Sequence, residues 1–547
     1  MKRTISKTPR PAKMTKRAFS PYWHYALVGV IILLFAVIRF RLRDFPLERD
    51  EGEYAYMGQL MLQGIPPYKL AYNMKLPGTY AAYALILAVF GQTPDGIHCG
   101  LILINAATTL LVYFLGRRLF GSLAGVVACA CYALLSTSST VLGFAAHATH
   151  FVVLMALAGI LLLLKAMEGK GGWLFFVSGI LVGLAFIMKQ PGIFFVLFAG
   201  SYLLYRDWRE RPVDRKDLML RSGLFWLGAT APFVITCLLL YTAGVFDKFW
   251  FWTFSYARAY GSQTDMGSGL LGFGNTFPRV VGPSMLIWIA AALGLTTLLW
   301  QPDSRSRAYF VLGFPAFSFL AVCPGLYFRP HYFILLLPAV ALLAGLAVDS
   351  ASRFLSKRGS SPGMAPALVL ILGFAYSVYQ QGQYLFELNP VQACRASYGT
   401  SPFPESLEIA KYIEDHTSKD ARIVILGSEP QIYFYSRRHS ATGYIYMYSL
   451  MEQHPYVLQM QQTMIDEIEK ARPEYLIFVP QVTSWMAGPK SERLIVNWGN
   501  KYARSHYSLD GIADIRGTEE TIYRWGQEAR TYRPLSESTI LIYKRND

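Results

Sequence analysis

Long apolar runs separated by short polar segments fill the first 385 residues of the chain. A helix needs about 20 apolar residues, and at least roughly 17, to cross the hydrocarbon core of a bilayer. Eleven runs come near this length, so the pattern predicts a polytopic α-helical membrane protein with about 11 transmembrane helices. The runs are residues 22–40, 97–115, 122–143, 148–165, 173–188, 191–205, 223–243, 281–300, 308–323, 331–349 and 364–385.

The segment Gly78–Phe90 is apolar but too short to cross a bilayer comfortably, and a re-entrant or interfacial helix is the alternative. Lys and Arg distinguish the two topologies, because cytoplasmic loops collect them. If the segment does not cross, the cytoplasmic loops hold about twice as many of these cations as the outer loops, and crossing reverses the ratio. We therefore predict an outer juxtamembrane helix, a cytoplasmic N-terminus and an extracytoplasmic tail.

The composition agrees with a membrane protein, since the mean hydropathy is +0.30 and only 16% of the residues are charged. A net charge of +16 also occurs in nucleic-acid binders, but here the cations gather in predicted cytoplasmic loops, so we expect no nucleic-acid partner. The basic residues 1–21 precede an apolar run without a small-residue cleavage site, which predicts a retained span. The six cysteines form no CxxC pair and no disulfide framework.

The polar tail, residues 386–547, has a different pattern from the membrane domain, residues 22–385. Strands are predicted at 422–426, 475–480 and 539–543, with a helix at 458–471 between the first two, which is typical of a small α/β domain. Glu429 follows the first strand, where a ligand sometimes binds. A loop acid without chemistry is the alternative.

Two predicted outer loops are long, residues 41–96 and 244–280, and the second carries aromatic residues suited to the headgroup interface. Four carboxylates fall within six residues of the first loop: Glu48, Asp50, Glu51 and Glu53. They can form a solvated helix start, since acids favour a first turn. Alternatively, the amphipathic stretch at 54–61 lies flat on the membrane and holds a partly desolvated carboxylate that acts as a general base. Both interpretations remain open.

Three cations fall at outer ends of predicted spans and run against the charge bias: Lys75, Lys189 and Arg329. Each can be an interfacial anchor whose aliphatic stem lies in the apolar region. Together they can bind phosphate, which is the most common anion at a membrane surface.

The order of these features resembles the GT-C membrane glycosyltransferases, in particular the bacterial members similar to protein O-mannosyltransferases and the lipid A aminoarabinose transferase (glycosyltransferase family 39-like). In that family a first span precedes an outer loop that opens with an Asp-Glu pair, followed by a Lys-Pro element and a short juxtamembrane helix. The resemblance covers roughly residues 22–350, whereas the tail matches only as an extracytoplasmic domain. The similar stretches are Asp50-Glu51, Tyr54, Lys75-Leu76-Pro77-Gly78, 78–90, Leu115–Gly121, Ile187–Gly192 and Arg329–Phe333 with Leu337-Pro338-Ala339.

This resemblance implies an inverting glycosyltransferase at the outer face of the bacterial cytoplasmic membrane. The donor would be a polyprenyl-phosphate sugar, and the acceptor a hydroxyl of a glycan, lipid or protein. Asp50 would be the catalytic carboxylate with Glu51 supporting it, and the three cations would bind the donor phosphate. The candidate substrate-binding residues are Tyr54, His147, His150, His331 and Tyr332.

The chain departs from the family in the outer loop before the fourth span. Several GT-C enzymes carry a second acid there, whereas residues 143–150 hold only His147 and His150. These histidines are either hydrogen-bonded interface residues or substrate-binding groups. The missing acid favours a site without a metal or other cofactor.

A transporter or flippase of lipid-linked sugars is the alternative function. Transporters tend to show inverted repeats, broken helices and mid-membrane charges, whereas the charges of this chain gather at the predicted outer face. A non-catalytic scaffold is a third function, but it would have no need of the Asp50-Glu51 pair.

Overall fold

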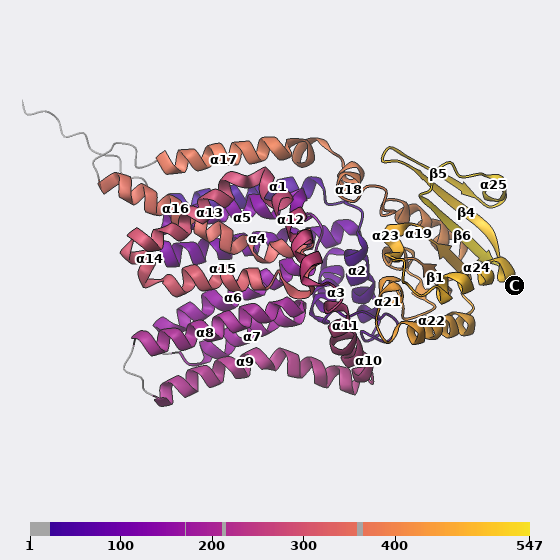
Figure 1. The fold of residues 1–547 in the computed structure, drawn as a ribbon, viewed down its shortest axis with the longest axis horizontal. Coiled ribbons are helices and arrows are strands. Elements are labelled where there is room, and N and C mark those ends of the chain that lie inside the picture. Colours follow the sequence, from indigo (N-terminus) through magenta and orange to yellow (C-terminus); the bar gives the residue numbers. More distant parts are fainter. Residues whose placement is uncertain (1–21, 170, 211–214, 358–364, 547) are drawn as a thin grey trace, which may run out of the picture.

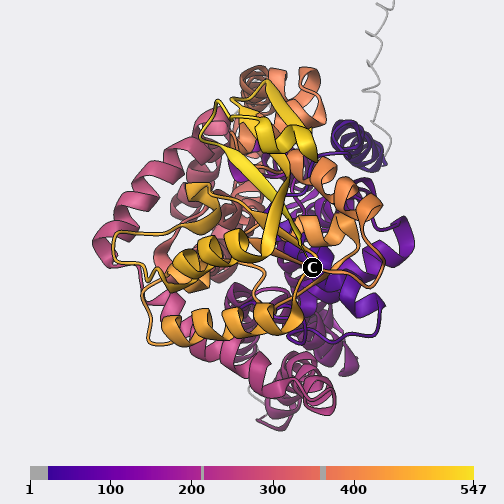
Figure 2. The same ribbon diagram turned by 90° about the vertical axis from the view of Figure 1, so that its right-hand side faces the viewer.

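The computed structural model describes residues 22–169, 171–210, 215–357 and 365–546. Figure 1 shows long helices lying side by side, with a mixed helix and sheet domain at one end of the bundle. Seen from that end, the C-terminal domain lies across the helices (Figure 2). The predicted basic segment 1–21 lies outside the described residues.

The bundle consists of apolar helices, and all eleven predicted runs correspond to helical segments. Within the described chain, six helices or helix pairs are long and apolar enough to cross a membrane, and four further apolar helices are shorter. The chain is thus a multi-pass helical membrane protein. The helices are α1 (Trp23–Arg41), α4 (Pro94–Phe120), α5 (Ser122–Ser136), α6 (Ala148–Glu168), α7 (Trp173–Met188), α8 (Ile193–Glu210), α9 (Arg215–Thr242), α12 (Met266–Val281), α13 (Met285–Trp300), α15 (Ala308–Leu320), α16 (Leu337–Lys357) and α17 (Ala365–Gly382), with the short α14 (Pro302–Ser306) between α13 and α15.

Two predicted runs begin or end differently from the helices that form. The run 122–143 is helical only to Ser136, after which the chain turns through the 3-10 helix η1 (Ser139–Val141). The run 331–349 starts in a 3-10 segment, η6 (Pro330–Leu335), before α16 begins. Apolar composition alone does not distinguish a spanning helix from an apolar segment that turns among other buried groups.

The first long loop folds into α2 (Arg49–Leu62) and α3 (Gly78–Phe90). A capping box between Glu48 and Glu51 starts α2, because each side chain accepts a hydrogen bond from the backbone N–H of the other residue. The prediction that residues 54–61 lie flat on the membrane is wrong. Helix α2 packs between α3 and α20 (Gln431–Ser436) of the C-terminal domain, and most of its residues are buried.

Glycines allow these close approaches. A Cβ atom on Gly52 would lie 2.6 Å from the backbone nitrogen of Gln431, and one on Gly58 would lie 2.9 Å from that of Ala84 in α3. On Gly78, at the start of α3, a Cβ atom would lie 2.5 Å from the carbonyl oxygen of Ile187 in α7. The first loop is therefore fixed against both the bundle and the C-terminal domain.

The second long loop, residues 244–280, is mostly helical rather than irregular. It consists of α10 (Phe246–Trp250), the π-helix η3 (Phe251–Tyr256), α11 (Ala257–Gly261) and most of α12. Its aromatic residues do not simply face the lipid interface, because Trp252 and Tyr256 are buried and Trp252 stacks on Tyr72 of the first loop.

The C-terminal domain contains a six-stranded mixed sheet in the order β2-β1-β3-β6-β4-β5. Strands β1, β2 and β3 are parallel, and β6, β4 and β5 continue the sheet in antiparallel pairs. The strands are β1 (Arg422–Leu426), β2 (His439–Ser440), β3 (Tyr475–Phe478), β4 (Tyr507–Arg516), β5 (Glu520–Trp525) and β6 (Thr539–Arg545). The helices are α18 (Pro390–Tyr398), α19 (Glu405–His416), α20, α21 (Tyr448–Met451), α22 (Val457–Ala471), α23 (Val482–Trp485), α24 (Leu494–His506) and α25 (Gln527–Thr531).

The predicted β1, α22, β3 and β6 are present, whereas the sequence pattern did not predict the two-residue strand β2 or the strands β4 and β5. Asp510-Gly511 and a register shift between Leu509 and Gly511 interrupt the apolar alternation of β4. Strand β5 lies at the edge of the sheet and is partly exposed, so it carries no strong apolar signal.

A single cluster of buried apolar side chains runs from the bundle through α2 into the sheet. At the junction, Arg49 forms an ion pair with Glu429 at 3.0 Å, and the Glu429 side chain is fully buried. Glu429 therefore joins the domains, which agrees with the interpretation that it carries no chemistry of its own.

Candidate active site

A cavity of about 220 Å³ lies where the bundle, both long loops and the C-terminal domain meet. Asp50 at the start of α2 and Lys75 before α3 line it, as do Lys189 between α7 and α8 and Arg329 before η6. The structure thus brings together the four principal residues singled out from the sequence. The other lining residues are Tyr72, Asn73, Met74, Gln190, Pro191, Trp252, Tyr256, Ala257, Tyr260, Gly261, Pro324, Gly325, His331, Tyr332, Tyr446, Tyr448, Ser449 and Glu452.

Two hydrogen bonds connect the loops that carry the lysines. The Thr79 hydroxyl donates to the carbonyl of Met188 at 2.7 Å, and the Gln190 amide donates to the carbonyl of Met74 at 2.6 Å. Together with the close contact at Gly78, these bonds fix Lys75 and Lys189 beside one another.

Lys75 joins two carboxylates. Its Nζ lies 2.7 Å from Asp50 Oδ1 and 2.6 Å from Glu53 Oε2, while the Tyr80 hydroxyl donates to Glu53 Oε1 at 2.6 Å. Glu53 is fully buried, so the interpretation of this acid as part of a solvated helix start is wrong. Burial raises the pKa of Asp50, but the charge of Lys75 outweighs it and holds that pKa well below its usual range. Asp50 is therefore ionised and accessible from the cavity.

Glu51 does not line the cavity and is fully buried behind it. Its Oε1 accepts a hydrogen bond from the backbone N–H of Ala146 at 2.6 Å and lies 3.0 Å from Nε2 of His98. The bond to Ala146 holds the segment that presents His147. Glu51 therefore fixes the backbone beside His147 and does not reach the cavity.

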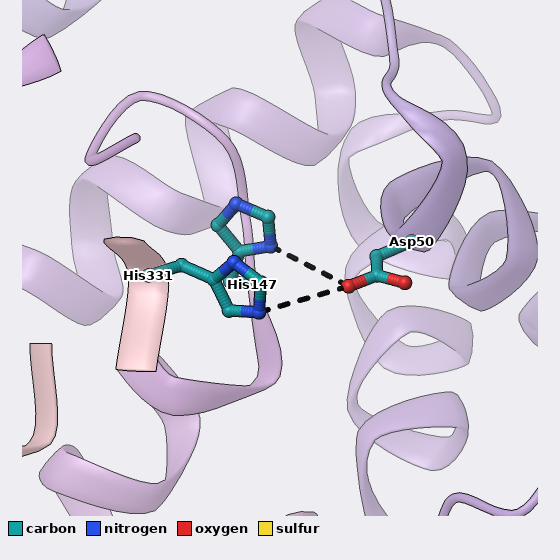
Figure 3. A group of neighbouring side chains, drawn as sticks. All are labelled: Asp50, His147 and His331. Atoms are coloured by element: carbon teal, nitrogen blue, oxygen red, sulfur yellow. Dashed lines mark ion pairs between the residues drawn. The ribbon is translucent and has the colours of Figure 1, made fainter. Parts of the chain in front are cut away.

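Two imidazole rings face Asp50 (Figure 3). His147 Nδ1 lies 4.0 Å and His331 Nε2 lies 3.9 Å from Asp50 Oδ2, and the two rings stack at a centroid distance of 4.2 Å. Burial lowers the pKa of His147 to about 4, so this ring is neutral near pH 7. Neither ring nitrogen of His147 has a hydrogen-bond partner among the described residues.

This donor set fits a divalent cation. Asp50, His147 and His331 each offer one ligand atom, and these atoms lie within 4.8 Å of one another. Neutral imidazoles and a carboxylate are common ligands of divalent transition metals. The expectation of a metal-free site rested on the missing second acid. The structure places His331, from a distant segment of the chain, beside Asp50 and His147 as a further candidate ligand.

Lys189 and Arg329 have no carboxylate within ion-pair distance among the described residues. The Lys189 ammonium lies 4.3 Å from the centre of the Tyr332 ring, and Arg329 donates a hydrogen bond to the Tyr260 hydroxyl at 3.4 Å. Burial lowers the pKa of Lys189 to about 7, helped by the charges of Lys75 and Arg329 and opposed by Asp50. Two cations in one cavity without an ion-paired carboxylate form a site suited to an anion.

The three remaining candidate substrate-binding residues lie in different surroundings. Tyr332 lines the cavity. Tyr54 is buried with its ring centre 4.6 Å from the Lys75 ammonium, so it supports that cation. His150 lies in α6 and is buried outside the cavity, with neither ring nitrogen hydrogen-bonded to a described residue.

Sequence reasoning missed the contribution of the C-terminal domain, which brings Tyr446, Tyr448 and Glu452 into the cavity. The Tyr446 hydroxyl donates to Asp50 Oδ1 at 3.3 Å. The tyrosines at 444, 446 and 448 were a usable signal, because tyrosine repeated at this spacing is unusual in a polar segment. Their distance from Asp50 along the chain concealed the connection.

The resemblance to membrane glycosyltransferases inferred from the sequence is confirmed by a family model, by curated relatives and by solved structures of similar fold. Residues 75–236 match the family model of the dolichyl-phosphate-mannose-protein mannosyltransferases. Two undecaprenyl phosphate-alpha-4-amino-4-deoxy-L-arabinose arabinosyl transferases of Pseudomonas aeruginosa are 31% identical over 175 and 176 residues. These matches cover 29% of this chain and 32% of each relative, so the chain matches about a third of the length of these curated relatives.

Solved structures extend the similarity of fold to nearly the whole chain. The crystal structure of ArnT from Cupriavidus metallidurans bound to undecaprenyl phosphate has a TM-score of 0.59 at 15% identity, covering 96% of this chain and 98% of that one. The Archaeoglobus fulgidus oligosaccharyltransferase in the apo form has a TM-score of 0.54 at 13% identity, covering 94% and 76%.

Proposed function

We propose that the protein is an inverting glycosyltransferase that moves a sugar from a polyprenyl-phosphate donor to an acceptor hydroxyl. The observation that carries this proposal is the single cavity in which ionised Asp50 faces Lys189 and Arg329, two cations without carboxylate partners. The names of the relatives add support, because they specify undecaprenyl phosphate or dolichyl phosphate.

Asp50 accepts the proton of the acceptor hydroxyl as its oxygen attacks the anomeric carbon of the donor sugar. A bond forms between that oxygen and the anomeric carbon, and the bond from this carbon to the phosphate oxygen breaks with inversion. Lys189 and Arg329 stabilise the charge on the leaving phosphate, and such electrostatic stabilisation is usually a large term in catalysis. Lys75 faces the cavity too, but it already pairs with Asp50 and Glu53, so its first role is to hold Asp50 ionised and in place.

A divalent cation, if one binds, would be held by Asp50, His147 and His331 and would supply further positive charge for phosphate. Glu51 keeps His147 in position through Ala146.

We further propose that all eleven apolar runs span the cytoplasmic membrane of a bacterium. The short helix α3 then stays on the outer face, and the C-terminal domain, residues 386–547, is extracytoplasmic. Nucleotide sugars are not available there, which agrees with a lipid-linked donor. The acceptor is a glycan, lipid or protein on the same side.

The test is Asp50→Asn, which keeps the volume of the side chain but removes the base. Transfer from a polyprenyl-phosphate sugar should fall by about a hundredfold to ten-thousandfold, the usual contribution of a general base. Donor binding should persist, since the cations that face the phosphate are unchanged. Asp44→Asn, which alters an exposed acid in the same loop, is the matched control and should transfer normally. Near-normal transfer by folded Asp50→Asn would rule out the general-base assignment.

A further inference from the structure

The C-terminal domain places one carboxyl group in the cavity, that of Glu452 just after α21. Glu452 Oε2 accepts a hydrogen bond from the Tyr256 hydroxyl and another, at 3.4 Å, from the Gln263 amide. Oε1 accepts no hydrogen bond from any described residue, and within the described chain no Lys or Arg lies within ion-pair distance of the group. One oxygen of this carboxyl group therefore remains available to a ligand.

Aromatic side chains line the same cavity as this carboxyl group. Trp252 and Tyr256 belong to the π-helix η3, a type of helix that is frequent at functional sites, and Tyr260 follows one turn later on α11. All three side chains line the cavity. Aromatic walls combined with a few fixed polar groups are typical of sites for small organic ligands.

Glu452 is unsuited to the phosphate itself, because a carboxylate repels a phosphate. Burial raises the pKa of Glu452 to about 7, while its hydrogen bonds and the charge of Arg329 act in the opposite direction. The charge of Arg329 interacts with both Asp50 and Glu452, and all three residues line the same cavity. A ligand whose phosphate lies on Lys189 and Arg329 presents a different part to Glu452.

We propose that Glu452, with Tyr256 and Tyr260, determines sugar specificity: its free oxygen accepts a hydrogen bond from a hydroxyl or amino group of the transferred sugar. This inference rests on the proposed function. The rings of Tyr256 and Tyr260 pack against the apolar face of the sugar. A site built to hydrogen-bond one polar group of a substrate strongly rejects an analogue that lacks that group.

The test compares lipid binding by the full-length protein in nanodiscs. The ligands are undecaprenyl phosphate alone and the same lipid phosphate carrying aminoarabinose, mannose or glucose. In Glu452→Gln the amide oxygen remains with the two donors, Tyr256 and Gln263, so an amide nitrogen replaces the free oxygen. The variant should bind the preferred sugar-bearing lipid at least about tenfold more weakly, which corresponds to 1.4 kcal/mol, and bare undecaprenyl phosphate unchanged.

Control variants separate this inference from the proposed function. Glu408→Gln alters an exposed acid of the same domain and should leave both affinities unchanged, whereas Arg329→Gln should weaken both. Glu452→Asp keeps the carboxyl group and should lose less affinity for the preferred lipid than Glu452→Gln. This difference would show that the loss in Glu452→Gln does not come from a folding defect. The inference is overturned if Glu452→Gln binds the preferred lipid like the wild type, or if the wild type binds no sugar-bearing lipid better than the bare one. If the wild type binds none of the lipids, the proposed donor itself is wrong.

Discussion

Lys75 and Lys189 line the same cavity, but their charges have different partners. Lys75 is neutralised by Asp50 and Glu53, and their charges raise its pKa above the usual value despite burial. Lys189 has no such partner among the described residues, and burial lowers its pKa to about 7. Two lysines in similar sequence settings thus differ in how readily each loses its proton.

The pKa of Lys189 predicts a pH dependence. Below about pH 7 the side chain is protonated and attracts the donor phosphate, and above that pH the charge is lost. The kcat/KM for the donor should therefore fall as the pH rises through about 7. Lys189→Arg keeps a protonated side chain throughout this range and should shift the decline to higher pH. An unchanged profile in Lys189→Arg would exclude Lys189 as the titrating group, and rate measurements between pH 5.5 and 9, a range of roughly two pH units about that pKa, suffice.

Residue types and their positions near span ends were enough to single out Asp50, Lys75, Lys189 and Arg329. The sequence alone could not show which charged side chains form ion pairs, because ion pairing depends on how the helices and loops pack. The burial of Glu53 depends on Tyr80 of α3, and the place of His331 depends on η6 reaching the start of α2. Glu452 was invisible for the same reason, since it belongs to another domain.

At the scale of elements, apolar runs located the helices well, because length and hydropathy are local properties. The short helix α3 has the bounds that its apolar segment indicated. The position of α2 was predicted wrongly, because its apolar side chains were assigned to lipid although the C-terminal domain covers them. Strands β4 and β5 were missed because a bulge and an exposed edge weaken their alternation.

The close packing of α2 on α20 can be tested at Gly52. A methyl group there meets the backbone of Gln431, so one of the helices must move. Gly52→Ala should lower the stability of the protein by about 1–3 kcal/mol, the usual cost of overpacking, and reduce transfer because Asp50 is two residues away. Thermal unfolding in detergent measures the first effect, and a transfer assay measures the second.

Gly274→Ala is the matched control, since a Cβ atom on this helical glycine of α12 meets nothing within 4 Å. It should be neutral or slightly stabilising, because alanine favours a helix more than glycine does. If both variants unfold at the same temperature, the tight contact between α2 and α20 is absent in solution.

At the scale of the whole molecule, the proposed topology places the cavity outside the cytoplasm. Alkaline phosphatase, which is active only outside the cytoplasm, should be active when fused to the C-terminus of the chain. The same reporter fused after Glu168, at the end of α6, should be inactive, because that end is proposed to be cytoplasmic. An inactive C-terminal fusion together with an active one after Glu168 would invert the topology and contradict the outer-face assignment.

The residues that line the cavity are synthesised at very different times in each molecule. Asp50 is translated early, whereas Tyr446, which donates a hydrogen bond to it, lies 396 residues further along the chain. Domains generally form in order during synthesis, N-terminal parts first. For most of its synthesis, a nascent chain therefore contains Asp50 and Lys75 but lacks the C-terminal domain that closes the cavity around them. We therefore expect the proposed activity only after the last domain has folded onto α2, and we expect truncated or stalled chains in the membrane to have none.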